Sequence, residues 1–170
     1  MINMEKFLEK ISRYHLLTNL IPGVLFIYLL NILCIYTIDM RDILTVLFLG
    51  YFAGMVISRI SSVVIEPWFR SWEIVKYAPY PDFLDAEQKD GKIPELLADN
   101  NMYRTVVAMF MLLLVLYVGH IIPAVDRFMH TKWAVLVALV LLLALYILAF
   151  RKQTTYIRKR VYKANNKPIE

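Results

Sequence analysis

The sequence predicts an all-α membrane protein with four transmembrane helices, an N-terminal amphipathic helix and a cytoplasmic connection between helices 2 and 3. Three observations predict this class. Hydrophobic residues make up 59% and charged residues 19% of the 170 residues, which is too apolar for an ordinary soluble domain. Four apolar runs have membrane length. Basic residues gather on one side of these runs, and the chain is short enough to form one domain, 1–170.

The first segment, Met1 to Leu17, is amphipathic and suits a helix lying on the membrane surface, although a solvated helical lead-in fits it equally well. Its basic residues are Lys6, Lys10 and Arg13. The first span follows at 18–38. Asn31 is its one strongly polar side chain deep in the span, and we expect it to hydrogen-bond a neighbouring helix. A pore or ligand role for Asn31 is the alternative.

The second span, 43–65, carries small residues at every fourth position: Gly50, Gly54, Ser58 and Ser62. On a helix they form a ridge along one face, where another helix can approach closely. The ridge predicts helix packing, either between copies in a homo-oligomer or within one chain. The link 39–42 is so short that spans one and two must be antiparallel neighbours.

Arg59 and Glu66 mark the inner end of the second span, just before Pro67. They are seven residues apart and therefore share a helix face, which predicts a charge pair at the inner membrane boundary, either within the helix or between protomers. In an oligomer, Arg59 could instead form a positive ring at a pore mouth. Snorkelling of Arg59 to the lipid headgroups is the simpler expectation.

The cytoplasmic connection, 67–104, begins with aromatic residues, among them Trp68 and Trp72, which are typical of the headgroup level. We expect Asp82 to cap a short helix that runs through Glu87. Asp82 and Asp85 belong to an acidic set that could dock a partner. A solvated acidic loop is the simpler interpretation, and metal or acid–base chemistry the less favoured one.

The third and fourth spans are expected at 105–122 and 133–150, and a basic cytoplasmic tail at 151–170. We expect the tail to contact anionic lipid headgroups or a protein partner through four basic residues, Arg158, Lys159, Arg160 and Lys163. With the N-terminus in the cytoplasm, sixteen Lys and Arg residues fall inside and three outside. The positive-inside rule then predicts a membrane protein with both termini and the long connection in the cytoplasm.

Chemical motifs are scarce. No carboxylate lies within the four predicted spans, which disfavours a proton-coupled transporter. The single cysteine, Cys34, excludes an intrachain disulfide. His120 and His130 share only the outer side, beside Asp126, and a zinc site there would need a third protein ligand in the same place, so we do not expect one. We therefore expect no enzyme activity, no catalytic residue, no metal and no cofactor.

Four segments resemble the small membrane subunits of bacterial anti-phage defence systems, in particular the Kiwa membrane component. They are NLIPG at 19–23, YFAG at 51–54, SRIS at 58–61 and NNMYRT at 100–105. The resemblance covers the whole chain as architecture and transfers no residue role. It implies an oligomeric inner-membrane sensor or scaffold that recruits a cytoplasmic nucleic-acid-binding partner, so that nucleic acid is contacted only indirectly.

Two functions from different classes follow from these observations. The first is an inner-membrane scaffold or sensor that oligomerises and docks a cytoplasmic protein through 68–104 and the basic tail. The second is a small oligomeric channel or membrane-perturbing effector, with Asn31 or Arg59 lining the oligomer axis.

Overall fold

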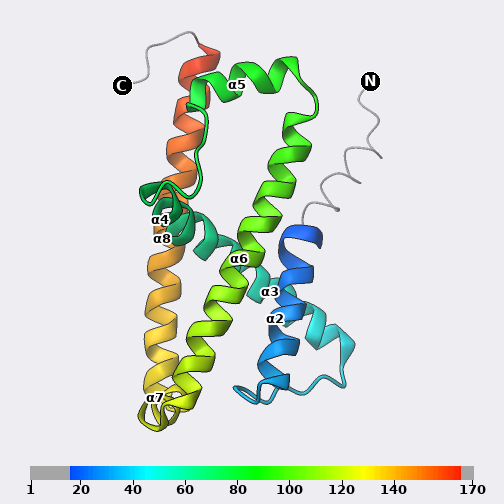
Figure 1. The fold of residues 1–170 in the computed structure, drawn as a ribbon, viewed down its shortest axis with the longest axis vertical. Helices are drawn as coiled ribbons and strands as arrows, with labels where there is room; N and C mark the ends of the chain where they lie inside the picture. The colour runs from blue at the N-terminus through cyan, green and yellow to red at the C-terminus, as the bar shows by residue number, and fades with distance from the viewer. Residues whose placement is uncertain (1–15, 166–170) are drawn as a thin grey trace.

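The computed structural model describes residues 16–165, and all its regular elements there are helices (Figure 1). The predicted surface helix at Met1–Leu17 lies almost entirely outside the described residues, as does the end of the basic tail. Three helical stretches are long and apolar enough to cross a membrane: Ile43–Ser71, Ile93–Ile121 and Lys132–Ala164. The first apolar helix, Thr18–Ile32, is shorter. The all-α membrane class is thus confirmed at this coarser level.

The first helix consists of a π-helical turn, η1 (Leu16–Leu20), and α2 (Ile21–Ile32). It ends before the predicted boundary at Ile38, because Cys34 adopts a left-handed conformation, φ 54°. The N–H of Ile35 then bonds the Leu30 carbonyl at 3.1 Å, and the N–H of Cys34 bonds the Asn31 carbonyl at 3.1 Å. These two bonds form a Schellman motif, the usual way to satisfy the last carbonyls of a helix.

Cys34→Gly is expected to stabilise the protein by about 1 kcal/mol, because a non-glycine residue in the left-handed region costs about 1–2 kcal/mol. Little packing is lost, since the Cys34 side chain is exposed. Thermal unfolding in a mild detergent measures the change. Cys34→Ala removes the same thiol but keeps the strain, so it should show no gain; equal behaviour of the two variants would contradict the explanation.

The second long helix is continuous from Ile43 to Ser71 and comprises α3 (Ile43–Ile60), a π-helical turn η2 (Ser61–Ile65) and α4 (Glu66–Ser71). Asp42 caps its start, accepting from the N–H groups of Leu44 and Thr45 at 3.2 and 3.1 Å. Hydrogen bonds from the Thr45 hydroxyl, and then from these N–H groups, lower the pKa of Asp42. The cap is therefore ionised at neutral pH, which also suits the positive end of the helix dipole.

The remaining helices are α5 (Tyr80–Lys89), α6 (Ile93–Ile121), α7 (Pro123–Met129) and α8 (Lys132–Ala164). Asp82 does not cap α5 as expected: the helix begins two residues earlier, after Pro79, and Asp82 lies in its first turn. The polar segment from Ile93 continues into the third apolar run without a break. The fourth run likewise continues into the basic segment.

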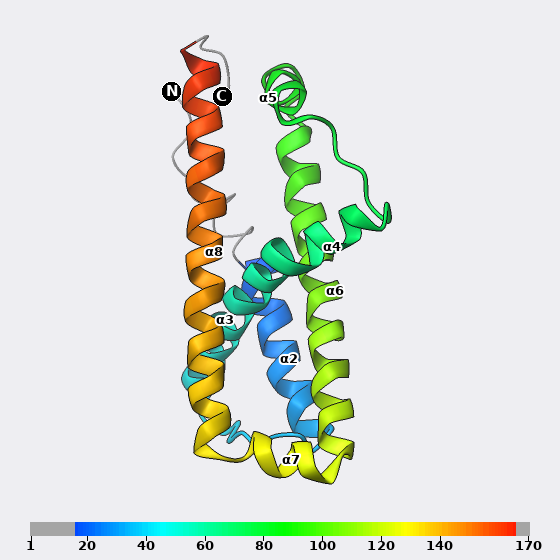
Figure 2. The ribbon, with the colours of Figure 1, turned by 90° about the vertical axis from the view of Figure 1, so that its left-hand side faces the viewer.

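The helices lie in a loose bundle (Figures 1 and 2). Helix α5 and the end of α8 lie at the upper end, and α7 and the loop after α2 lie at the lower end, while η1 begins about midway between them, near the level of α4. The long helix α3–α4 crosses the others diagonally (Figure 2). The apolar core lies between α2, α3, η2 and α6, with Ile57 and Met109 almost fully buried. Helix α8 contributes Leu145 and Ala149 as its buried residues, and most of its apolar surface is exposed.

Candidate functional site

Three helices meet at Glu66, the first residue of α4. Its side chain is 8% exposed and accepts a hydrogen bond from Arg104 of α6. The Lys152 ammonium of α8 donates to the same carboxylate oxygen at 3.0 Å, to the Ser62 hydroxyl at 2.9 Å and to the Ser62 carbonyl at 2.6 Å. We call these four residues, Ser62, Glu66, Arg104 and Lys152, the charge cluster. The charge cluster connects three helices: the long second helix through Ser62 and Glu66, α6 through Arg104 and α8 through Lys152.

The charge cluster places two cations on one carboxylate, so it carries a net positive charge in a largely desolvated position. The Arg104 and Lys152 side chains are 19% and 26% exposed. Arg104 Nε is buried and has no hydrogen-bond partner within residues 16–165. Such a cluster stabilises the fold only while the carboxylate is present, because a buried cation without its counter-charge is costly.

The intrahelical pair predicted between Arg59 and Glu66 is not formed, and a pair between protomers stays a prediction. Glu66 pairs with Arg104 and Lys152, whereas Arg59 is exposed. The cause is the π-helical turn η2 between them. A π-helix accommodates an additional residue per turn, so residues on its two sides no longer share the face that an α-helical spacing of seven predicts. Arg59 is suited to snorkelling, because its side chain is exposed and has no counter-charge among the described residues.

The small-residue ridge packs within the chain. Gly50 and Gly54 are buried against η1 and α2: an added Cβ would lie 2.4 Å from Val24 Cγ2 at Gly50 and 1.8 Å from the Asn19 carbonyl oxygen at Gly54. Further along, the Ser58 carbonyl accepts from the Ser61 hydroxyl at 2.7 Å, and Ser62 belongs to the charge cluster. Close packing is therefore the role of the two glycines, and the ridge gives no separate argument for an oligomer.

Asn31 does not bridge to another helix. Its amide Nδ2 donates to the Ile38 carbonyl at 3.0 Å, in the loop that follows its own helix. The bond fixes the reversal of the chain after Cys34. The sequence could not reveal the Ile38 carbonyl as the partner of Asn31, because the first helix was expected to continue to Ile38.

The acidic and basic docking residues pair with each other. Lys163 donates to Asp85 at 2.7 Å and Arg160 to Glu87, while the rings of Tyr80 and Tyr156 lie 5.2 Å apart. These contacts hold α5 across the upper ends of α6 and α8 (Figure 1). We call α5 and the segments 93–104 and 151–164 the helical platform. Asp82 is exposed on it.

The two tryptophans lie beside the helical platform. Trp68 and Trp72 form an edge-to-face pair with ring centroids 5.0 Å apart, and Trp72 is 66% exposed. They sit at the end of α4, where the chain leaves the long helix in a second left-handed residue, Glu73. Exposed aromatic pairs at such a boundary suit contact with headgroups or a partner.

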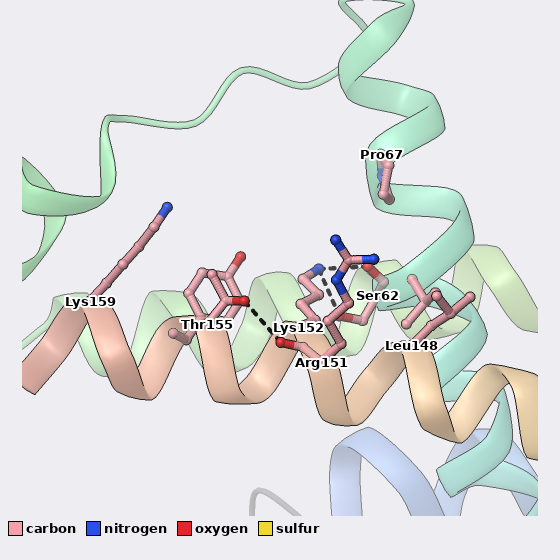
Figure 3. Close-up of a pocket in the computed structure, with 9 residues that line it drawn as sticks. Ser62, Pro67, Leu148, Arg151, Lys152, Thr155 and Lys159 are labelled. Atoms are coloured by element: carbon pink, nitrogen blue, oxygen red, sulfur yellow. Dashed lines mark hydrogen bonds between the residues drawn. The ribbon is translucent and has the colours of Figure 1, made fainter. Parts of the chain in front are cut away.

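An open groove of about 370 Å³ separates the π-helical turn from α8 (Figure 3). One wall consists of Ser62, Val63 and Pro67. Helix α8 forms the other wall with Leu148, Arg151, Lys152, Thr155, Tyr156 and Lys159. The lining thus changes along α8 from apolar to basic.

At the opposite end, Asp126 of α7 lies between two histidines. His120 Nδ1 is 2.7 Å from an Asp126 carboxylate oxygen, and His130 Nδ1 is 2.9 Å from the Asp126 carbonyl. Tyr36 donates to the Met129 carbonyl at 3.2 Å and tethers the loop after α2 to the same turn. Among residues 16–165, no three or more side chains of His, Cys, Asp or Glu are arranged to hold a metal ion.

Comparison with protein-family models, with curated proteins and with solved structures found no match to this chain. The functional argument therefore rests on the residues themselves. Sequence reasoning singled out Glu66 but missed Arg104 and Lys152 as its partners. The available signal was that both cations directly flank apolar runs at the same predicted membrane level.

Proposed function

We propose that the protein is a four-span inner-membrane scaffold or sensor whose cytoplasmic face docks a soluble protein. One observation carries the proposal: α6 and α8 extend beyond their apolar runs and are joined there by α5 into the helical platform. A helix of 33 residues, such as α8, is about 50 Å long, whereas the hydrocarbon core is about 30 Å thick. The part of α8 beyond the hydrocarbon core is folded, polar and held in place by ion pairs to α5, which are properties of a docking surface.

The proposed membrane arrangement is supported by the ends of the helices. The platform lies at one end of the bundle, and the first helix begins with its η1 end facing that side, near the level of α4 (Figure 2). The basic excess on this side is the one expected of a cytoplasmic face. The first apolar helix is short for a span, but its exposed apolar residues include Ile21, Leu25 and Ile32. A short span is accommodated by local thinning of the bilayer at modest cost.

The resemblance to the Kiwa membrane component points to anti-phage defence as the setting of this scaffold. The exposed apolar surface of α8 offers a contact to lipid or to another copy, so homo-oligomerisation belongs to the same proposal. In the alternative, a small oligomeric channel, the exposed Arg59 would line the axis.

Charge reversal on the platform tests partner docking. Arg160→Glu with Lys163→Glu places like charges opposite Glu87 and Asp85, which should release α5 and lower recovery of a soluble partner from the native cell roughly tenfold or more. Mass spectrometry of the protein purified in mild detergent measures the recovery. Hydrogen exchange of α5 verifies its release.

The matched control adds Asp85→Lys and Glu87→Lys to the same chain, which restores both ion pairs with reversed polarity. We expect α5 to regain its protection and partner recovery to rise again. The proposal would be contradicted if partner recovery were unchanged by charge reversal on the platform, or if no soluble protein were recovered in stoichiometric amount. Ion flux through vesicles containing the purified protein would instead favour the channel.

A further inference from the structure

The groove between the π-helical turn and α8 is amphipathic along its length. Its apolar end is formed by Leu148 and Val63, next to the last residues of the apolar run. Arg151, Thr155 and Lys159 follow at intervals of four and therefore lie along one side of α8, over a rise of about 12 Å. Figure 3 shows Arg151 and Lys159 extending from α8 with Thr155 between them.

Three cations line the groove, and two of them, Arg151 and Lys159, have no counter-charge among the described residues. Lys152 pairs with Glu66, Arg160 with Glu87 and Lys163 with Asp85. Arg151 and Lys159 form no ion pair with any residue in 16–165, and the groove lining contains no carboxylate. The folded chain thus leaves two positive groups aimed at one open site.

A second hollow, of about 480 Å³, lies alongside the first and shares Arg151, Thr155 and Lys159 with it. Its remaining lining again combines apolar and polar residues: Ile147, Phe150, Thr154 and Arg158. Arg151 and Lys159, which line both hollows, therefore have apolar side chains in each, and these apolar side chains lie toward the N-terminal part of α8. A ligand that fits this arrangement has one anionic head and apolar chains.

We propose that this groove is a binding site for an anionic phospholipid. The phosphodiester lies between Arg151 and Lys159, and the acyl chains follow Leu148, Ile147 and Phe150 toward the bilayer. The site rests on the proposed membrane arrangement, which puts the start of the basic segment at headgroup level. A zwitterionic headgroup fits less well, because its ammonium would find no carboxylate in the lining.

Native mass spectrometry of the full chain in detergent, titrated with phosphatidylglycerol, tests the site. Arg151→Gln with Lys159→Gln should weaken phosphatidylglycerol binding roughly tenfold or more, since each basic residue near an anionic headgroup contributes about a factor of five. Lys89→Gln with Lys92→Gln is the matched control. It removes two charges from exposed positions of the platform region outside the groove and should change binding less than about threefold.

Equal losses in the two double variants would overturn the proposal in favour of diffuse attraction to the basic end of the molecule, and no loss in either would overturn it outright. Wild-type protein must also bind phosphatidylglycerol more tightly than phosphatidylcholine, whatever the variants do. Glycerol phosphate supplies the same head without chains; if it bound as tightly as the lipid, the site would be one for soluble phosphates. None of these measurements needs the soluble partner, so failure here leaves partner docking untouched.

Discussion

Gly54→Leu is expected to prevent the first helix from packing on α3. A Cβ added at Gly54 would lie 1.8 Å from the Asn19 carbonyl oxygen and 2.6 Å from its carbon. Both are backbone atoms, so no side-chain rotation relieves the overlap, and the helices must separate. Overpacking of a core usually costs about 1–3 kcal/mol, and we expect a loss at or above the upper end of that range. Thermal unfolding in mild detergent and the yield of monodisperse protein measure it.

The other glycines provide graded controls. Gly23→Ala should be comparably severe, because its Cβ would lie 1.8 Å from the Gly50 carbonyl oxygen. Gly119→Ala should be mild, with Val125 Cγ1 at 3.3 Å as the nearest atom, and Gly91→Ala should be neutral, with no atom within 4 Å. A stable, monodisperse Gly54→Leu variant would contradict the packing. If its mass in detergent were also unchanged, the ridge would be excluded as an oligomer contact too.

The sequence predicted the long helices well because their signal is composition over membrane length, which does not depend on contacts. It predicted their ends less well, because ends are set by local backbone chemistry. The early end of α2 depends on a left-handed Cys34, and a cysteine is not a residue from which such a cap is expected. In α6 and α8 the helix is longer than its apolar run, because each continues through a polar or basic segment.

Partners across helices were the least predictable feature. The seven-residue spacing of Arg59 and Glu66 assumed a regular α-helix, and η2 breaks that assumption between them. The charges of α5 and the basic segment were expected to form two parts of one face, and they do lie together. Acidic residues of α5 form ion pairs with Lys163 and Arg160. This pairing depends on the path of the connection between the helices, which no local sequence pattern predicts.

Glu66→Ala is expected to destabilise the protein by about 3–5 kcal/mol, the usual cost of removing one partner from a buried ion pair. The substitution leaves Arg104 and Lys152 close together without a carboxylate, and the Arg104 Nε already lacks a hydrogen-bond partner in the described part of the chain. Since α4, α6 and α8 meet at this point, all three should lose protection together. Thermal unfolding in mild detergent gives the loss, and hydrogen exchange locates it.

Neutralising Arg104 and Lys152 distinguishes two effects of Glu66→Ala: the loss of the carboxylate's own interactions, and the cost of leaving two buried cations without a counter-charge. Lys152→Met alone keeps the Glu66–Arg104 pair, so its cost should be smaller than that of Glu66→Ala. Combining Glu66→Ala with Lys152→Met and Arg104→Met should recover much of the stability, because apolar residues of similar volume often replace buried ion clusters at little cost. Simple addition of the three losses would show that the groups act independently. Recovery would instead show that the carboxylate is needed because it lies between two cations, which makes Glu66 the electrostatic centre of the three-helix junction beneath the platform.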